Sequence, residues 1–496
     1  MERNWIERLD EPIIDKSENF RYSEEDLETN NDIGSQDSQD QSSSDFMGIT
    51  KDILKGAIPT MIQLFSALFV NNTTLHFIGL KNDTNLFNGI SLGNNVLGCF
   101  SFYIIFHTNI GLTAASSQAQ GALQFKSVGH YLHRALLIHL IVNAIMYLLL
   151  FNISHVFGLM GIEPAVAEVA SDYLVFSPLY TIGVILFDTV KAFLYAQGIF
   201  NPQLVCQFVI TISYWFLTKL FVIEHDMKEG GIMLGLTISH LLGAVLLFLY
   251  IQFKRPVELS SSWFFFEKES FQGVWQLFQI MFGVGTMGYV EVLAYKILSF
   301  LAIYFTAAQM TTFVTFLAID DLFYVLPVGI AISLTTSIGN AIGSRDKNRI
   351  KRVINITLIL SFVFLAFLLA TFIVFKKAIF GFYIQNPEVD RLLLKVSHIY
   401  ALFLVADFTQ NIFGGILKGV GKEKSGTKAF LFSAYLISIP IALFLGFYLQ
   451  LEALGMWIGA TLGLYCVLAN YLYILKKLDF TQQFNYVAKR IKETEL

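Results

Sequence analysis

The sequence predicts an all-α polytopic membrane protein, with twelve transmembrane helices in two pseudo-symmetric six-helix bundles. Three observations lead to this fold class: an apolar composition, twelve long apolar runs and an internal repeat. Of the 496 residues, 55% are hydrophobic and only 15% are charged, whereas soluble domains carry about 25% charged residues. The loops between the runs are short, which excludes a large soluble catalytic domain. We expect a lipid bilayer as partner and no nucleic acid.

The two ends of the chain are polar. Residues 1–46 are rich in Ser, Asp, Glu, Asn and Gln and contain too few apolar side chains to offset the entropy of ordering. We therefore expect a disordered cytoplasmic tail there, and a second cytoplasmic tail at 478–496. Met1 is followed by mixed charge and not by the apolar stretch of a signal peptide.

A membrane-spanning helix needs about 20 mostly apolar residues. The runs that meet this length are 53–80, 88–116, 129–157, 165–194, 203–223, 231–252, 272–302, 308–339, 351–375, 389–417, 428–449 and 453–475. Prolines inside four of them are compatible with spanning helices. The runs predict an N-terminal lobe at 47–255, a cytoplasmic inter-lobe linker at 256–270 and a C-terminal lobe at 271–477.

Lys and Arg gather in alternate loops, which sets the expected orientation. One set of loops carries Lys126, the cluster from Arg345 to Arg352, and Lys418 to Lys428, and it continues into the C-terminal tail. The opposite set carries few basic residues. Because basic loops stay on the cytoplasmic side, both termini are predicted to be cytoplasmic. The sequence contains no address that distinguishes the plasma membrane from a vacuolar or other endomembrane.

A short motif occurs once in each half of the chain. Leu112–Gly121 and Leu334–Gly343 both read L-T-x-x-x-x-x-A-x-G, and each ends an apolar run before a basic loop. A G-x-x-x-G pattern likewise opens the sixth run at Gly231 and the twelfth at Gly455. Because each half has an even number of spans, the two halves are expected to share one orientation, related by an axis along the membrane normal.

Acidic residues within the apolar runs are the strongest functional signal. An acid at the bilayer centre costs about 3 kcal/mol on insertion scales, so its presence indicates a function or a specific partner. Glu291 and Asp407 lie deep in the seventh and tenth runs, and we predict that they form a functional site. A carboxyl group away from water favours its neutral form, so such an acid can exchange a proton for an organic cation. A structural acid bonded to Ser, Thr or Tyr is the alternative.

Three further acids are possible accessory groups. Asp320 and Asp321 are adjacent, so on a helix they point about 100° apart and at most one faces a given cavity. Asp188 is one turn from Lys191, which favours a local ion pair. Lys296 lies near Glu291 and either holds that acid ionised or extends towards the membrane surface.

No metal site is expected. Cys99, Cys206 and Cys466 all lie in apolar runs, without the spacing of a disulfide framework or of metal ligands. His130 and His133 begin the third run without acidic or cysteine neighbours, so an interfacial helix cap is favoured over a metal pair.

These motifs resemble those of the multidrug and toxic compound extrusion (MATE) transporters, especially the eukaryotic branch, from about residue 50 to 475. Leu112–Ala122 is similar to S-A-x-D-T-L-x-G-Q-A-x-G-A, and Asp407–Gly421 to D-x-x-Q-x-x-x-x-G-x-x-R-G-x-G. The other similar segments are Gly129–Ala135, Phe193–Gln197 with Pro202, Leu326–Ile330 with Ser337–Gly343, and Gly455–Gly459.

The resemblance implies roles for two residues and departs from the family at others. Glu291 and Asp407 occupy the positions of the family's acids in the C-terminal lobe, which bind coupling cation and substrate. Many eukaryotic relatives carry a second glutamate where this chain has Thr286, and tryptophans where it has Met287 and Gly288. The helix 1 aspartate of many prokaryotic members aligns near Thr74, which leaves an N-lobe proton site in doubt.

The sequence thus predicts a secondary active antiporter and not an enzyme. It would export organic cations, xenobiotics or metabolites in exchange for H⁺ or Na⁺ by alternating access, as a monomer and without a cofactor beyond the coupling ion. One alternative is a lipid-linked oligosaccharide flippase of the same wider superfamily. A membrane-embedded acyltransferase-type enzyme would need a His/Asp or Ser/His constellation, and a channel would not need paired buried acids.

Overall fold

The computed structural model describes residues 31–254, 261–383 and 386–495, with side chains from Phe46 to Thr494. The chain divides into two compact units, residues 1–49 and 50–496. Helix α1 (Asn31–Gly79) begins inside the range for which the sequence predicted a disordered tail. A helix that has nucleated in a span extends at low cost per added residue. Residues 1–30 of that tail and residues 256–260 of the predicted linker lie outside the described residues.

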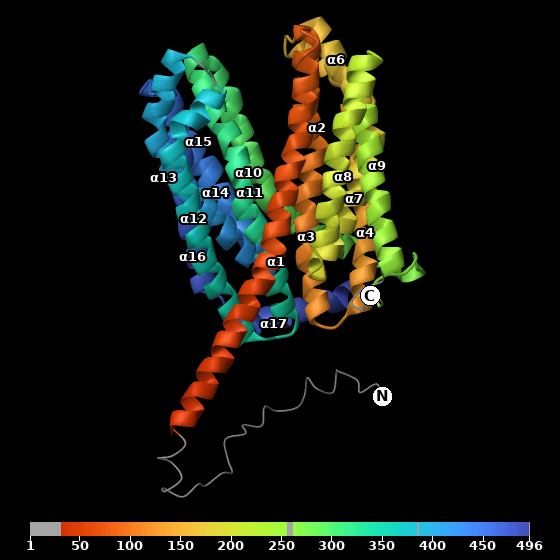
Figure 1. Ribbon diagram of the computed structural model, residues 1–496, viewed down its shortest axis with the longest axis vertical. Helices are drawn as coiled ribbons and strands as arrows, with labels where there is room; N and C mark the ends of the chain where they lie inside the picture. Colours follow the sequence, from red (N-terminus) through yellow and green to blue (C-terminus); the bar gives the residue numbers. More distant parts are fainter. Residues whose placement is uncertain (1–30, 255–260, 384–385, 496) are drawn as a thin grey trace, which may run out of the picture. The chain divides into compact units, whose positions relative to one another are not determined.

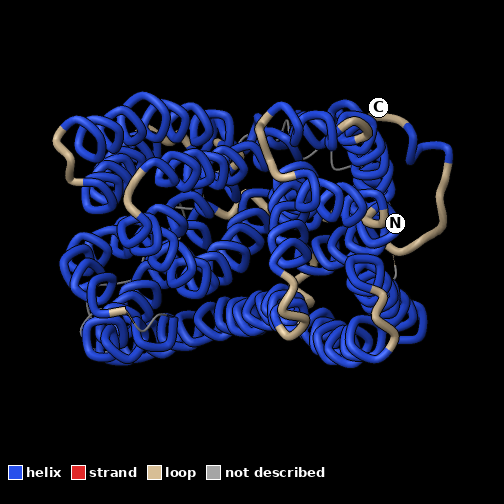
Figure 2. The backbone as a smooth tube through the Cα atoms, turned by 90° about the horizontal axis from the view of Figure 1, so that it is seen from above, coloured by secondary structure: helices blue, strands red, loops and turns tan. Residues whose placement is uncertain are grey.

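Twelve spans among the described residues are long and apolar enough to cross a membrane, which confirms the predicted number. They are formed by α1; α2 (Thr84–Leu97) with α3 (Tyr103–Gly121); α4 (Phe125–Leu150); α7 (Pro178–Ala196); α8 (Asn201–Thr218); α9 (Lys228–Lys254); α10 (Val274–Leu301); α11 (Ala307–Gly343); α12 (Lys347–Tyr383); α13 (Pro387–Val420); α14 (Glu423–Ser433) with α15 (Ile439–Leu443); and α16 (Glu452–Lys476). The described residues form only helices and loops (Figure 2).

Three α-helices of the described residues lie outside these spans: α5 (Ile153–Leu159), α6 (Pro164–Val175) and α17 (Phe480–Glu495). The sequence had predicted one span at 165–194, but the chain there forms α6 and then α7, which begins at Pro178. Proline lacks an N–H and fits the first turn of a helix, so it ends one helix and begins the next. The third span also ends earlier than predicted, at Leu150.

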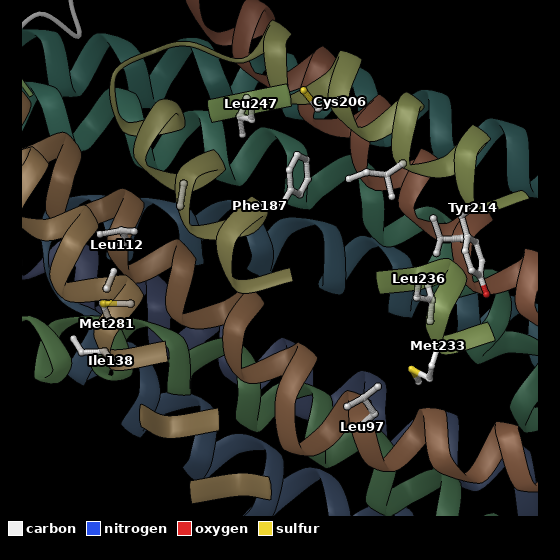
Figure 3. Packing of buried hydrophobic residues seen from close by; sticks show 14 of the residues in the cluster. Leu97, Leu112, Ile138, Phe187, Cys206, Tyr214, Met233, Leu236, Leu247 and Met281 are labelled. Carbon is white, nitrogen blue, oxygen red and sulfur yellow. The ribbon is translucent and has the colours of Figure 1, made fainter. Parts of the chain in front are cut away.

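The spans gather into two bundles. The N-lobe contains residues 50–254 and the C-lobe residues 274–476; in Figure 1, the orange to yellow-green helices α2–α9 lie to one side and the green to blue helices α10–α16 to the other. Phe187, Tyr214 and Leu247 belong to one apolar core that lies mainly in the N-lobe and continues into α10 of the C-lobe at Met281 (Figure 3). In the C-lobe, the buried Trp457 contacts four aromatic rings, those of Phe313, Phe316, Tyr400 and Phe403.

The repeated motif explains how the lobes meet. Gly121 packs against the backbone of Asn340, and the equivalent Gly343 packs against the backbone carbonyl of Gln118. Gly121 and Gly343 occupy the same place in the two copies of the motif, and so do Gln118 and Asn340. The contact is therefore reciprocal, as a two-fold relation requires. Gly339 also lies against Ser117, its own counterpart. The glycines allow the backbones of α3 and α11 to approach closely, which confirms the predicted pseudo-symmetry.

We call the end at which α3, α11 and α13 terminate the basic end, because Lys126, Arg345, Lys347 and Lys422 lie in or beside the connections there. Helix α17 lies at this end (Figure 1), in the range for which the sequence predicted a tail. One face of α17 is buried, at intervals of three and four residues: Gln483, Val487, Arg490, Ile491 and Thr494. This spacing places all five on one side of the helix.

Candidate functional site

The two acids predicted to carry function are joined by one amide group. Glu291 lies on α10 and Asp407 on α13. The Nε2 atom of Gln410 donates to Glu291 Oε1 at 2.6 Å and to Asp407 Oδ1 at 3.4 Å. The two carboxylate oxygens are therefore no farther apart than the sum of these two distances. The structure thus brings the two acids together inside the C-lobe.

Both carboxyl groups are almost completely buried. Glu291 is 6% exposed and Asp407 is 3% exposed. The Nδ2 atom of Asn411 donates to both carboxylate oxygens of Asp407, at 3.3 and 3.4 Å. Two acids this close and this buried cannot both carry uncompensated charge, because desolvation and mutual repulsion act in the same direction. The site is suited to holding a proton or another cation.

The adjacent acids on α11 have different surroundings. The Tyr400 hydroxyl donates to Asp320 Oδ1 at 3.2 Å, and Asp320 is close enough to Asp407 for their charges to interact. Asp321 instead interacts with Lys296. Asp320 therefore lies within electrostatic reach of the acid pair, and we call these three carboxyl groups the acid cluster. Asp321 is instead within reach of Lys296, as the helical angle between neighbours predicts.

Aromatic rings pack around Tyr400, whose hydroxyl bonds to Asp320 of this acid cluster. The ring of Phe403 lies 5.9 Å from that of Tyr295 and 5.8 Å from that of Tyr400, measured between centroids. Negative ring faces attract organic cations as well as pack against apolar groups. Lys418, half-buried near the end of α13, acts electrostatically on Glu291, so the cluster already has one internal cation nearby.

Lys296 bonds to the N-lobe and not to Glu291 in the described contacts. Its Nζ atom donates to Asn95 Oδ1 at 3.0 Å and lies 5.9 Å from the centre of the Tyr103 ring. Both partners belong to the N-lobe, so Lys296 links α10 of the C-lobe to α2 and α3.

Asp188 is not part of the acid cluster. Its carboxylate forms an ion pair with Lys191 at 2.5 Å, which confirms the predicted local pair. Both residues line a small cavity between α1, α3, α7 and α11. Asn109 lines the same cavity, and its side-chain nitrogen and oxygen atoms lack a hydrogen-bond partner.

The two histidines contact the linker. The Nδ1 atoms of His130 and His133 both lie 3.0 Å from the hydroxyl of Ser270. Lys126 pairs with Glu267 at 2.9 Å, and this hydrogen bond lowers the pKa of the Glu267 carboxyl. The part of the linker that the structure describes is thereby fixed to α4. Within the described ranges, no group of three or more His, Cys, Asp or Glu side chains is arranged to hold a metal ion.

Comparison with known families agrees with this arrangement. The MatE family model matches the chain twice, at residues 59–217 and 285–444. These two segments correspond to the two lobes and together cover more than half of the chain. The chain belongs to the MatE family. Members of this family are transporters, so the protein is a membrane transporter and not an enzyme.

Relatives of this MatE protein are distant but extend over most of its length. Multidrug and toxin extrusion protein 1 of Oryctolagus cuniculus is 24% identical over 444 residues, which is 88% of this chain and 77% of the relative. Protein DETOXIFICATION 6 of Arabidopsis thaliana is 22% identical over 84% of this chain and 86% of its own. The crystal structure of the eukaryotic MATE transporter AtDTX14 matches 90% of this chain and 99% of its own, with a TM-score of 0.84 and 18% identity.

Gly288, where the resemblance implied a tryptophan in relatives, has no room for a larger side chain. A Cβ atom at this position would lie 2.6 Å from the Cε1 atom of His107, closer than real Cβ atoms approach. The buried His107 of α3 fills the space that a larger residue would need. Thr286 bonds only to the carbonyl of its own helix at Phe282, and Thr74 bonds to the Tyr214 hydroxyl at 2.6 Å. Neither position supplies a charge.

Three residues that bond to the acids of the site were not assigned from the sequence: Gln410, Asn411 and Tyr400. Gln410 and Asn411 follow Asp407 by three and four positions, which places them on its face of the helix. That spacing was a usable signal. Tyr400 is two turns from Asp407, but its bond to Asp320 joins α13 to α11, and no spacing within one helix indicates a contact between two helices.

Proposed function

We propose that this MatE transporter is an antiporter that exports organic cations in exchange for H⁺ or Na⁺. The acids of the C-lobe alternate between the coupling cation and a positively charged, amphipathic substrate. The names of the relatives, multidrug and toxin extrusion and DETOXIFICATION, support export of toxic small molecules. Recognition by charge and by aromatic rings tolerates many structures, because neither interaction requires a defined hydrogen-bond pattern.

The observation that carries the proposal is the shared Gln410 amide. A single neutral donor serves both Glu291 and Asp407, so it orients the two carboxyl groups without neutralising either of them. One added positive charge is then strongly favoured in this low-dielectric site. A proton, a sodium ion and an organic ammonium group compete for the same acids, and this competition couples their movements in opposite directions.

The transport cycle follows from the two lobes. The basic end faces the cytoplasm, since basic loops are retained there, and in the present structure the lobes are in contact at this end. With the opposite end open, a cation enters and displaces the substrate. The lobes then rock so that the α3–α11 contact separates and the basic end opens, the coupling cation leaves, and substrate binds from the cytoplasm. Such alternation between two states is the usual scheme for transporters built from repeats.

Transport by purified protein in liposomes tests the proposal. Efflux of ethidium is measured under a pH gradient and, separately, under a Na⁺ gradient. Glu291→Gln and Asp407→Asn each retain the shape of the side chain but remove the exchangeable charge, so gradient-driven efflux should fall to the rate of protein-free liposomes. The gradient that drives efflux by the unchanged protein identifies the coupling ion.

Glu388→Gln is the matched control. Glu388 lies on α13, like Asp407, but it is exposed in the first turn of that helix. Its replacement should leave efflux unchanged. Full activity of both Glu291→Gln and Asp407→Asn, in protein that elutes as a single species, would refute the proposed function.

A further inference from the structure

Helix α17 contacts both lobes at the basic end. On the C-lobe side, Gln483 donates to the carbonyl of Gly421 at 3.2 Å, and Lys347 lies 5.8 Å from the centre of the Phe480 ring. On the N-lobe side, α17 contacts α3 through Arg490 and α4 through Thr494. A helix that crosses the boundary between two moving bodies restrains their separation.

Arg490 makes both connections with one side chain. Its Nη1 atom pairs with Glu423 of the C-lobe at 3.0 Å, and its Nη2 atom donates to Gln118 Oε1 of the N-lobe. All three residues are buried, with exposed fractions of 8%, 2% and 1%. The guanidinium group has a fixed fork of donors, which suits it to hold two acceptors at once. Separation of the lobes must break at least one of these bonds.

The last turns of α17 add contacts to the N-lobe. Thr494, fully buried, bonds through its hydroxyl to that of Tyr131, and its carbonyl accepts from Arg134. A Cβ atom on Gly273, the residue before α10, would lie 2.7 Å from this same carbonyl. The end of α17 therefore occupies the junction where α4 meets the start of the C-lobe.

Gln118, which accepts a hydrogen bond from Arg490, lies where α3 packs against α11. Its Nε2 atom donates directly to the carbonyl of Gly419 in the C-lobe at 2.9 Å, while its backbone carbonyl faces Gly343. Arg490 thus reinforces an existing contact between the lobes. A cavity of about 250 Å³ between α17, α10 and α14 reaches Arg490 and Glu423, so water can solvate both charges once their bond breaks.

We propose that α17 is a clasp that stabilises the state closed at the basic end and must release one lobe before that end opens. Arg490 is its central residue, with Thr494 as the second attachment. The clasp sets the balance between the two states of the transporter and does not bind the substrate. The clasp proposal rests on the alternating-access part of the proposed function and not on the acid pair.

Distances between spin labels at the basic end test the clasp directly. Asn201→Cys on α8 and Asn348→Cys on α12 place exposed labels on the N-lobe and the C-lobe, in a background without Cys99, Cys206 and Cys466. The labelled protein with Arg490 in place should show one short distance. Arg490→Gln should add a longer distance and raise the ratio of open to closed molecules about tenfold or more, since charged hydrogen bonds contribute that much.

Lys489→Gln is the control, because this neighbour of Arg490 is exposed and pairs only within α17. It should leave the distances unchanged. Tyr131→Phe with Thr494→Val tests the second attachment while Arg490 stays in place, and it should also raise the open fraction. Unchanged distances in both folded sets of variants would overturn the proposal. Because no gradient or substrate is involved, this outcome is distinguishable from a failure of the antiport proposal.

Discussion

Replacement of Gly121 by alanine should destabilise the protein by separating the lobes. The added Cβ atom would lie 2.7 Å from both the Cα and the carbonyl carbon of Asn340, and its carbonyl oxygen is closer still. Ordinary contact begins at 3.4 Å, so the backbones of α3 and α11 would have to move apart by at least the difference between these distances. Overpacking of this kind typically costs about 1–3 kcal/mol, and backbone atoms cannot rotate away as a side chain can.

The reciprocal contact makes a second variant informative. Gly343→Ala would place a Cβ atom 2.8 Å from the backbone nitrogen of Ala122, so its cost should be similar. Gly381→Ala on α12 is the control, because a Cβ atom there meets nothing within 4 Å. Alanine favours a helix by up to about 1 kcal/mol over glycine, so this control should be neutral or slightly stabilising.

The measurement is the temperature at which purified protein loses its monodisperse elution after heating, compared among the three variants. Gly121→Ala and Gly343→Ala should both unfold below the unchanged protein, and Gly381→Ala should not. If Gly121→Ala and Gly343→Ala are as stable as the control, the close approach of α3 and α11 is wrong. If only one of them is destabilised, the reciprocal contact between the repeated motifs is wrong.

Three further outcomes are expected. Gln410→Leu removes the donor shared by two buried carboxyl groups, a loss of about 1–3 kcal/mol that should lower the unfolding temperature; an unchanged temperature would contradict the shared bond. Lys418→Met removes a positive charge near Glu291 that should repel the cation ethidium, so ethidium should bind more tightly in a fluorescence titration. Weaker binding by this variant would refute such a repulsion. Lys191→Met leaves Asp188 charged and mostly buried, which should lower the free energy of unfolding by about 3 kcal/mol. Adding Asp188→Asn should restore most of this stability, and the absence of such a rescue would show that the two residues are not coupled.

Much of the fold followed from local patterns in the chain. A span is recognised from its own apolar length, and the two copies of the L-T-x-x-x-x-x-A-x-G motif indicated two related lobes. The sequence did not separate α6 from α7, because the residues on both sides of Pro178 are apolar and hydropathy alone does not mark a break. It also treated residues 478–496 as a tail, although the buried positions of α17 recur every three or four residues. That signal was available but concerns a helix too polar to span a membrane.

The acids of the site were predictable from the sequence, but the residues that bond to these acids were less so. Glu291 and Asp407 stood out because a charge in an apolar run has few structural explanations. Their connection through Gln410, the Tyr400 bond to Asp320 and the Lys296 bond to Asn95 all join different helices. Such contacts depend on how helices are rotated and packed, and hydropathy carries little information about that rotation.

The most direct test of the acid pair as the coupling device is to count the cations displaced when substrate binds. Ethidium is titrated calorimetrically into purified protein in buffers of different ionisation enthalpy, with and without Na⁺. The account predicts that binding releases protons or is weakened by Na⁺, and that Glu291→Gln and Asp407→Asn remove this dependence. Binding that releases no proton, ignores Na⁺ and is unchanged in both variants would contradict it.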